Sequence, residues 1–183
     1  MRIATIGRGN VGSGLARLWR DAGHEVVEIG REGGDIAGAE AVLLAVPSGA
    51  IADALGSVTG IEGVPVIDAT NARGGDRSEE FTSLAEYVRS LTGGPVAKAF
   101  NTNFARLYDR LGEARARPSM VYAADKEARA VTEQLIRDAG YEPVSAGDLA
   151  SSRAVEDFLG VIFAVAQAGG GPFLYRIAAP ETL

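Results

Sequence analysis

Cysteine is absent from this chain of 183 residues, and histidine occurs once, as His24. Without cysteine there is no disulfide, no zinc–thiolate site and no cysteine nucleophile, and one histidine cannot build a histidine metal site. Long apolar runs are also missing, since the most apolar late segment, Phe158–Ala168, is too short to span a bilayer. The N-terminus has no signal-peptide pattern, so we expect a cytoplasmic protein without membrane partners.

A strong charge of one sign is missing as well. The formal net charge is −6, and no long run of like charges occurs. A weakly acidic surface argues against nucleic acid and anionic membranes as partners, but it permits a small anionic ligand at one local site. The hydrophobic fraction of 46% is ordinary for a globular protein. We therefore expect one folded domain over residues 1–183.

Strand and helix patterns alternate along the chain. Strands are predicted at Arg2–Ile6, Glu25–Ile29, Ala41–Val46, Val64–Ala69, Pro95–Phe100, Ser119–Ala123 and Tyr141–Ser145. Helices are predicted at Asn10–Ala22, Ala50–Leu55, Ser78–Leu91, Lys126–Ala139 and Ser151–Gln167. This rhythm predicts an α/β fold of the Rossmann type, with a doubly wound, mostly parallel sheet. Residues 150–183 would form a C-terminal apolar helix and tail.

A glycine-rich turn follows the first strand and opens the first helix, with the sequence Gly7-Arg8-Gly9-Asn10-Val11-Gly12. Gly7 permits the tight turn, Gly9 lets a pyrophosphate approach the backbone, and Gly12 allows close packing of helix and strand. The helix start offers free N–H groups to phosphates. A turn of this kind that binds nothing is the alternative, and the strand–turn–helix context disfavours it.

The end of the second strand predicts the choice of cofactor. In NAD-binding versions an acidic residue here accepts hydrogen bonds from the ribose hydroxyls. This chain has Gly30 and then Arg31, a small residue and a cation that suit a 2′-phosphate and so favour NADP(H). Arg8 is a second candidate phosphate contact. The alternatives are that Glu28 is the true acidic position, and that both arginines are ordinary solvated surface residues.

Short polar side chains follow three further strands, where ligands of open α/β sheets bind. They belong to the segments Val46-Pro47-Ser48, Asp68-Ala69-Thr70-Asn71 and Phe100-Asn101-Thr102-Asn103. Each residue alone is equally consistent with a turn or a helix cap. As a set at three strand ends, they are predicted to line a pocket.

No general acid or base stands out, so the catalytic residues are unknown at this stage. His24 precedes the second strand and is expected on a surface loop. Lys98 lies inside a strand and could be a structural ion-pair partner. Tyr108 and Tyr122 could donate protons, but nothing in their spacing selects them.

Several segments together point to one family, namely the glycine turn, Gly30-Arg31, Ala45-Val46-Pro47, Lys98-Ala99-Phe100-Asn101-Thr102, Leu149–Glu156 and the closing segment Gly169–Leu174. Through them the chain resembles the NADP-dependent deazaflavin (coenzyme F-420) oxidoreductases, which are similar to the N-terminal domain of pyrroline-5-carboxylate reductases. The resemblance covers nearly the whole chain.

The resemblance implies hydride transfer between NADP(H) and a planar small-molecule acceptor, with a deazaflavin as co-substrate. It implies that Gly7, Gly9, Asn10, Val11 and Gly12 lie at the pyrophosphate, and Arg31 at the 2′-phosphate. It places Val46 and Pro47 beside the cofactor and Asn101 and Thr102 near the reacting ring. It also implies a homodimer built partly through the C-terminal helix.

The chain departs from the family at several positions. The glycine turn is one residue shorter than in the archaeal enzymes, Gly30 replaces a hydroxyl side chain, and Asn101 stands where some relatives carry histidine. These changes leave NADP(H) as the expected cofactor and do not specify the second substrate.

Two other functions remain open. An NADPH-dependent imine or carbonyl reductase would need a proton donor, for which Tyr108, Asp68 or water could serve. A non-catalytic NADP-binding sensor would bind the cofactor and contact a partner through Phe158–Phe173. The polar set at the strand ends speaks against the sensor.

Overall fold

The computed structural model describes residues 1–72 and 80–180. Its main sheet has seven strands in the order β2-β1-β4-β6-β7-β8-β9, and a second sheet pairs β3 with β5. The strands are β1 (Arg2–Ile6), β2 (Glu25–Ile29), β3 (Gly34–Asp35), β4 (Ala41–Leu44), β5 (Val58–Thr59), β6 (Val66–Asp68), β7 (Val96–Lys98), β8 (Ser119–Ala124) and β9 (Glu142–Ser145).

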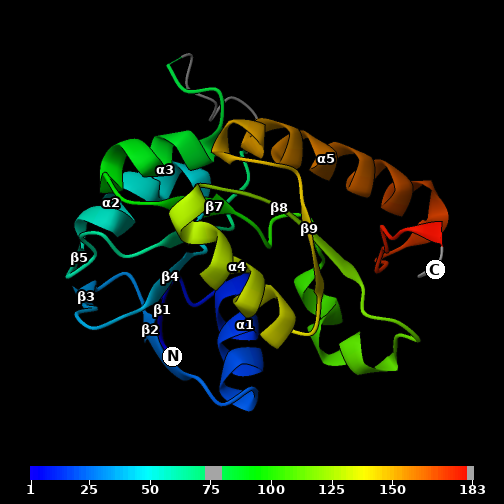
Figure 1. Cartoon of the computed structure of the whole chain (residues 1–183), viewed down its shortest axis with the longest axis horizontal. Coiled ribbons are helices and arrows are strands. Elements are labelled where there is room, and N and C mark those ends of the chain that lie inside the picture. The colour runs from blue at the N-terminus through cyan, green and yellow to red at the C-terminus, as the bar shows by residue number, and fades with distance from the viewer. Residues whose placement is uncertain (73–79, 181–183) are drawn as a thin grey trace.

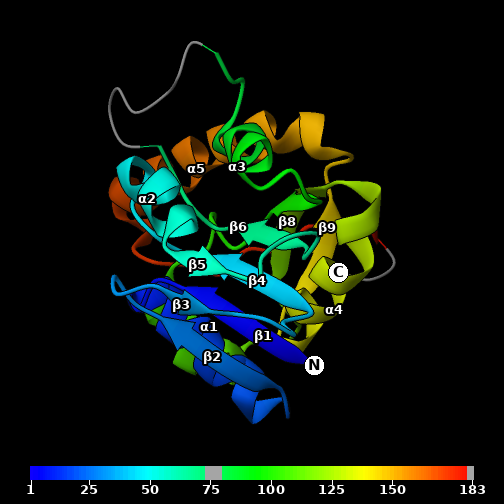
Figure 2. The ribbon, with the colours of Figure 1, turned by 90° about the vertical axis from the view of Figure 1, so that its left-hand side faces the viewer.

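Helices cover both faces of this sheet (Figures 1 and 2). The helices are α1 (Asn10–Asp21), α2 (Ile51–Gly56), α3 (Leu84–Thr92), α4 (Lys126–Asp138) and α5 (Ser152–Val165). The 3₁₀ segments are η1 (Ser48–Ala50), η2 (Ala105–Glu113) and η3 (Leu149–Ser151), and η4 (Ala166–Gly170) is π-helical. Helices α1 and α4 lie on one face, whereas α2, α3 and α5 lie on the other (Figure 2).

The direction of the strands decides where a ligand can bind. Strands β2, β1, β4, β6 and β7 run parallel to one another, and the β7–β8 pair is antiparallel. The Rossmann-type, mostly parallel sheet predicted from the sequence is therefore confirmed. The carboxyl ends of β1, β4, β6 and β7 meet at one edge, which we call the carboxyl edge. Ligands of open α/β sheets bind at this edge.

Two apolar layers stabilise the sheet, one on each face. On the α1 and α4 face, Trp19 is fully buried, and its indole N–H donates to the Leu135 carbonyl at 2.9 Å. On the opposite face, Ile51 of α2 and Val88 of α3 pack against Val42 and Leu44 of β4. Burial on both faces explains why the strand at Ala41 is an uninterrupted apolar run.

Three features differ from the sequence prediction. Helix α3 begins at Leu84, where the Ser83 hydroxyl caps the helix by accepting from the Glu86 N–H at 3.1 Å. The predicted helix start at Ser78 lies outside the described residues. The β3–β5 sheet and the long 3₁₀ segment η2 were not predicted, because two-residue strands and 3₁₀ turns carry no clear hydrophobic period.

The C-terminal segment returns to the sheet after α5 (Figure 1). The Ser119 N–H at the start of β8 donates to the Tyr175 carbonyl at 2.8 Å, and the Ile177 N–H donates to the Ser119 hydroxyl at 2.8 Å. Residues 175–177 are thereby held against the start of β8. Within residues 1–72 and 80–180, no helix has the length and apolar character needed to cross a membrane.

Candidate dinucleotide-binding site

The glycine turn joins β1 to α1 at the carboxyl edge. Gly7 has φ of 109° and its N–H donates to the Ile29 carbonyl at 2.9 Å. A Cβ atom on Gly7 would lie 2.3 Å from the Ala45 carbonyl oxygen, and one on Gly12 would lie 1.9 Å from the Gly7 oxygen. Only glycine fits at these two positions, because both contacts are with backbone atoms that cannot move aside.

Gly9 differs from Gly7 and Gly12 because there is free space where its side chain would be. A Cβ atom built on Gly9 would meet no atom within 4 Å. Gly9 also occupies the N-cap position of helix α1, where it offers no side chain to accept a hydrogen bond, and the first turn contains no acidic residue. The amide groups that open α1 are therefore uncapped beside an uncrowded backbone. This arrangement fits the pyrophosphate of a dinucleotide.

Glu28 is engaged with helix α1. Its carboxylate accepts from the Ser13 hydroxyl and from Arg20, each at 2.8 Å. Partial burial alone would raise the pKa of Glu28, but the hydrogen bonds from Ser13 and Arg20 and the arginine charge outweigh it, and its pKa is lowered. The strand ends one residue later, at Ile29, which is paired with Ile6. Glu28 thus has a structural role in the β2–α1 contact.

The end of β2 brings Gly30 together with Arg8 and Glu32. The Arg8 guanidinium donates to the Glu28 carbonyl at 2.8 Å and forms an ion pair with Glu32 at 2.7 Å. The small residue Gly30 was expected to leave space for a 2′-phosphate, but the side chains of Arg8 and Glu32 fill that space. Arg31 is exposed and has no side-chain partner among the residues that the structure describes.

Strands β4, β6 and β7 are neighbours in the sheet, so their carboxyl ends lie next to one another. Val46 lies against the glycine turn, because a Cβ atom on Gly7 would be 3.2 Å from its side chain. Pro47 precedes the η1 turn. The Asn71 side-chain amide donates to the Asn101 carbonyl at 2.9 Å, and the Asn101 amide donates to the Asn71 side-chain oxygen at 3.2 Å. The structure therefore joins two of the predicted site residues directly.

The turn after β7 depends on an unusual backbone conformation. Phe100 has φ of 62°, a left-handed value that is rare for a bulky residue. Its ring is buried and packs edge-on against Trp19, with the ring centroids 5.7 Å apart. Packing of this ring holds the strained turn in place. The strained turn in turn carries Asn101 to Asn71.

Asn101 and Thr102 are more covered than the sequence suggested. The Asn101 side-chain oxygen is buried and has no donor among the described residues. The Thr102 hydroxyl lies 2.8 Å from the Tyr175 hydroxyl, and Thr102 is only 1% exposed. Tyr175 was not identified from the sequence, because nothing local links it to β7.

A buried charge cluster lies beneath these strand ends. The Lys98 ammonium contacts Asp68 at 2.8 Å, Glu156 at 2.9 Å and the Thr70 carbonyl at 2.7 Å. Lys98 and Asp68 are fully buried. The predicted ion-pair role of Lys98 is confirmed. Glu156 of α5 was not predicted, and it also accepts from the Leu84 N–H at 2.9 Å, which ties α5 to α3.

The other candidate acids lie away from the carboxyl edge. Tyr108 is buried beneath α1, where its ring blocks any side chain at Gly14, and burial raises its pKa well above the usual value. Tyr122 donates to Glu133. His24 was expected on a surface loop, but its side chain is only 7% exposed and lies 2.9 Å from Asp138. None of the three lies in the site.

Comparison with known proteins adds a structural relationship. No model of a known protein family matches the sequence, and no curated protein matches it. A crystal structure from Arthrobacter sp. FB24, described as a proposed F420-dependent NADP reductase, superposes with a TM-score of 0.80. The two chains are 25% identical, and the match covers 98% of this chain and 100% of the other.

This chain is a structural relative of that reductase. The resemblance stated from the sequence is thereby supported over the whole fold. A hypothetical protein, SMa0349 from Sinorhizobium meliloti, is also 25% identical, with a TM-score of 0.70 and coverage of 97% and 94%. An imine reductase from Streptomyces aurantiacus is 15% identical, with a TM-score of 0.68. The match covers 92% of this chain but 63% of that enzyme, and it shows a shared fold alone.

Proposed function

We propose that this chain is an NADP(H)-dependent oxidoreductase that transfers a hydride between the nicotinamide and a deazaflavin or similar planar acceptor. The proposal rests on one observation above all. The end-to-end similarity to the Arthrobacter protein, which is described as a proposed F420-dependent NADP reductase, coincides with a glycine turn whose geometry fits a dinucleotide. No other candidate function has both kinds of support.

The residues at the carboxyl edge have distinct roles in this proposal. The pyrophosphate lies over Gly9 and the first turn of α1, and Arg31 and Arg8 bind the 2′-phosphate. Val46 and Pro47 lie beside the cofactor. Asn71, Asn101 and Thr102 orient the nicotinamide end, and the Asn101 side-chain oxygen, which has no donor among the described residues, accepts a hydrogen bond from the carboxamide.

When bound, NADP(H) supplies the hydride, and the protein aligns the two rings and excludes water. The charged groups beneath the strand ends are consistent with a protein that supplies alignment and no acid or base. Lys98, Asp68 and Glu156 are buried and paired with one another, so none is placed to exchange protons with a substrate. An imine or carbonyl reductase needs such a donor, and its proposed donor Tyr108 lies beneath α1.

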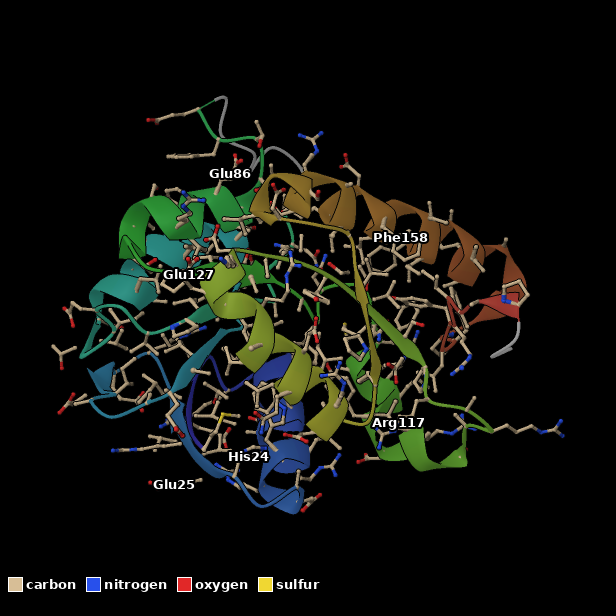
Figure 3. The ribbon with its side chains drawn as sticks, in the orientation of Figure 1. His24, Glu25, Glu86, Arg117, Glu127 and Phe158 are labelled. Atoms are coloured by element: carbon tan, nitrogen blue, oxygen red, sulfur yellow. The ribbon has the colours of Figure 1, made fainter. Side chains whose placement is uncertain are left out.

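We also propose that the chain forms a homodimer through α5 and the tail. Four large apolar side chains there are about half exposed, namely Val161 at 55%, Phe163 at 47%, Val165 at 47% and Ile177 at 48%. Phe158 of the same helix, labelled in Figure 3, packs on Tyr175, with ring centroids 5.5 Å apart. Light scattering on the wild type and Phe163→Glu tests this, and a monomeric wild type contradicts it.

The cofactor proposal is tested by fluorescence titration of NADPH and NADH into the wild type and Arg31→Ala. We expect preferential NADPH binding that is weakened by Arg31→Ala. Arg115→Ala is the control, because Arg115 is an exposed arginine in the loop after η2, away from the site. Equal or NADH-favoured binding would contradict the NADP assignment.

A second measurement tests hydride transfer. NADPH oxidation is followed with a deazaflavin, a flavin or a cyclic imine as the acceptor. Turnover with the deazaflavin supports the proposal. Turnover with the imine alone would make the chain an imine reductase, and tight NADPH binding without turnover on any acceptor would favour the non-catalytic sensor.

A further inference from the structure

The carboxylate of Glu32 lies beside Gly30, a position at which the chain has no acidic residue. Gly30 occupies the position after β2 at which NAD-binding versions carry an acidic residue. A Cβ atom built on Gly30 would lie 2.4 Å from a carboxylate oxygen of Glu32 and 2.7 Å from the Arg8 guanidinium. Glu32 therefore reaches back over Gly30, so that a negative charge returns to the end of β2 from two residues further along the chain.

This carboxylate is held by Arg8. The ion pair is 2.7 Å long, and Arg8 is anchored on its other side by the Glu28 carbonyl at 2.8 Å. A hydrogen bond from its own backbone amide, together with the charge of Arg8, lowers the pKa of Glu32, so the group is ionised at neutral pH. The side chains of Arg8 and Glu32 are 52% and 60% exposed. An ion pair this exposed is weak and exchanges partners readily.

We propose that Glu32 is a specificity-determining residue that competes with the cofactor 2′-phosphate for Arg8. This inference rests on the proposed function, since it assumes that the adenosine end of a dinucleotide lies at β2. With NADPH, the phosphate replaces the Glu32 carboxylate on Arg8 and is joined by Arg31. With NADH, Glu32 stays over Gly30 and accepts a hydrogen bond from the ribose hydroxyls.

Competition between Glu32 and the 2′-phosphate for Arg8 lowers the ratio of NADPH affinity to NADH affinity but does not abolish the preference for NADPH. A phosphate carries more charge than a carboxylate and pairs with arginine through two parallel hydrogen bonds, so it displaces Glu32. The displaced carboxylate remains close, because residues 30–32 are adjacent, and it repels the phosphate that replaced it. Removing the charge of Glu32 removes both the competitor and the repulsion. NADPH affinity should therefore rise while NADH affinity should not.

The test compares dissociation constants for NADPH, NADH and 2′,5′-ADP, which carries the 2′-phosphate without the nicotinamide. They are measured by fluorescence titration and calorimetry on the full chain, for the wild type, Glu32→Gln and Glu25→Gln. Glu25→Gln is the matched control, because Glu25 is an exposed glutamate at the opposite end of β2, 3.5 Å from Arg2 (Figure 3). Both variants change the net charge equally.

We expect Glu32→Gln to tighten NADPH and 2′,5′-ADP binding by roughly two- to fivefold, the size of one charge–charge interaction at an exposed site. NADH binding stays equal or weakens, and Glu25→Gln leaves the NADPH/NADH ratio unchanged. A ratio that Glu32→Gln leaves unchanged or lowers would overturn the role of Glu32 while leaving the proposed function intact. A wild type that binds neither dinucleotide would overturn the proposed function and the inference with it.

Discussion

Two groups of charged residues lie near the carboxyl edge, and they differ in burial more than in chemistry. Arg8 and Glu32 form a single pair at 2.7 Å that is mostly exposed to solvent. Lys98, Asp68 and Glu156 form contacts of 2.8 and 2.9 Å in a site closed to solvent. The distances are almost the same, but the free energies of breaking the contacts differ.

Water accounts for this difference. A charge separated from its partner at the surface is solvated at once, so the pair contributes little to stability and is available to a ligand. In the core, a charge separated from its partner finds no water to solvate it and stays uncompensated. The first group therefore suits ligand exchange, and the second fixes the positions of β6, β7 and α5 beneath the site.

The largest expected effect comes from the buried cluster. Lys98→Met leaves two carboxylates without a cation, and we expect it to lower the free energy of unfolding by about 3–5 kcal/mol. Urea denaturation of the wild type and the variant measures this. The control is the triple variant Lys98→Met, Asp68→Asn, Glu156→Gln, which removes every charge and should recover much of the loss. A loss below about 1 kcal/mol in Lys98→Met would show that the cluster behaves like a surface pair.

The next effect separates two glycines of the same turn. Gly12→Ala forces a Cβ atom into the Gly7 oxygen, so we expect a loss of about 1–3 kcal/mol in the free energy of unfolding. Gly9→Ala meets no atom, so its stability should stay within about 0.5 kcal/mol of the wild type. NADPH binding should nevertheless weaken in Gly9→Ala. Thermal unfolding and NADPH titration of both variants test this, and unimpaired binding by Gly9→Ala would contradict a pyrophosphate over Gly9.

A smaller effect concerns acid stability. The lowered pKa of Glu28 means that its contacts stabilise the fold above its ordinary pKa of 4.5 and that this contribution is lost as the pH falls below that value. Glu28→Gln should therefore be less stable than the wild type at pH 7, by less than about 1 kcal/mol, with the difference shrinking below pH 4.5. Urea titrations across this range measure it. A difference that grows with acidification would contradict the assignment.

A similarly small effect on stability is expected at Arg8. Because Arg8 and Glu32 are mostly exposed, Arg8→Gln should change the free energy of unfolding by less than about 1 kcal/mol. The same variant should weaken 2′,5′-ADP binding. Calorimetry for binding and urea denaturation for stability separate the two. A large loss of stability would place Arg8 with the buried cluster.

Much of the fold was predictable from local patterns. The strands of the main sheet all occur close to their predicted positions, and the ends of β1 and β2 match to the residue. Hydrophobic period, glycine at the turns and the apolar run at Ala41 are local signals that survive folding. The β3–β5 pair carries no such signal, because its strands are too short to show a period.

The glycine turn and its context were set by the amino-acid sequence, since the conformations open to Gly7 and Gly12 depend on the absence of their side chains. Which distant groups meet was decided by packing. Glu156 reaches Lys98 from α5, Tyr175 covers Thr102 from the tail, and Glu32 folds back over Gly30. Local preference cannot specify these contacts, because each depends on how elements far apart in the chain, or a loop and its neighbouring strand, come together once apolar surface is buried.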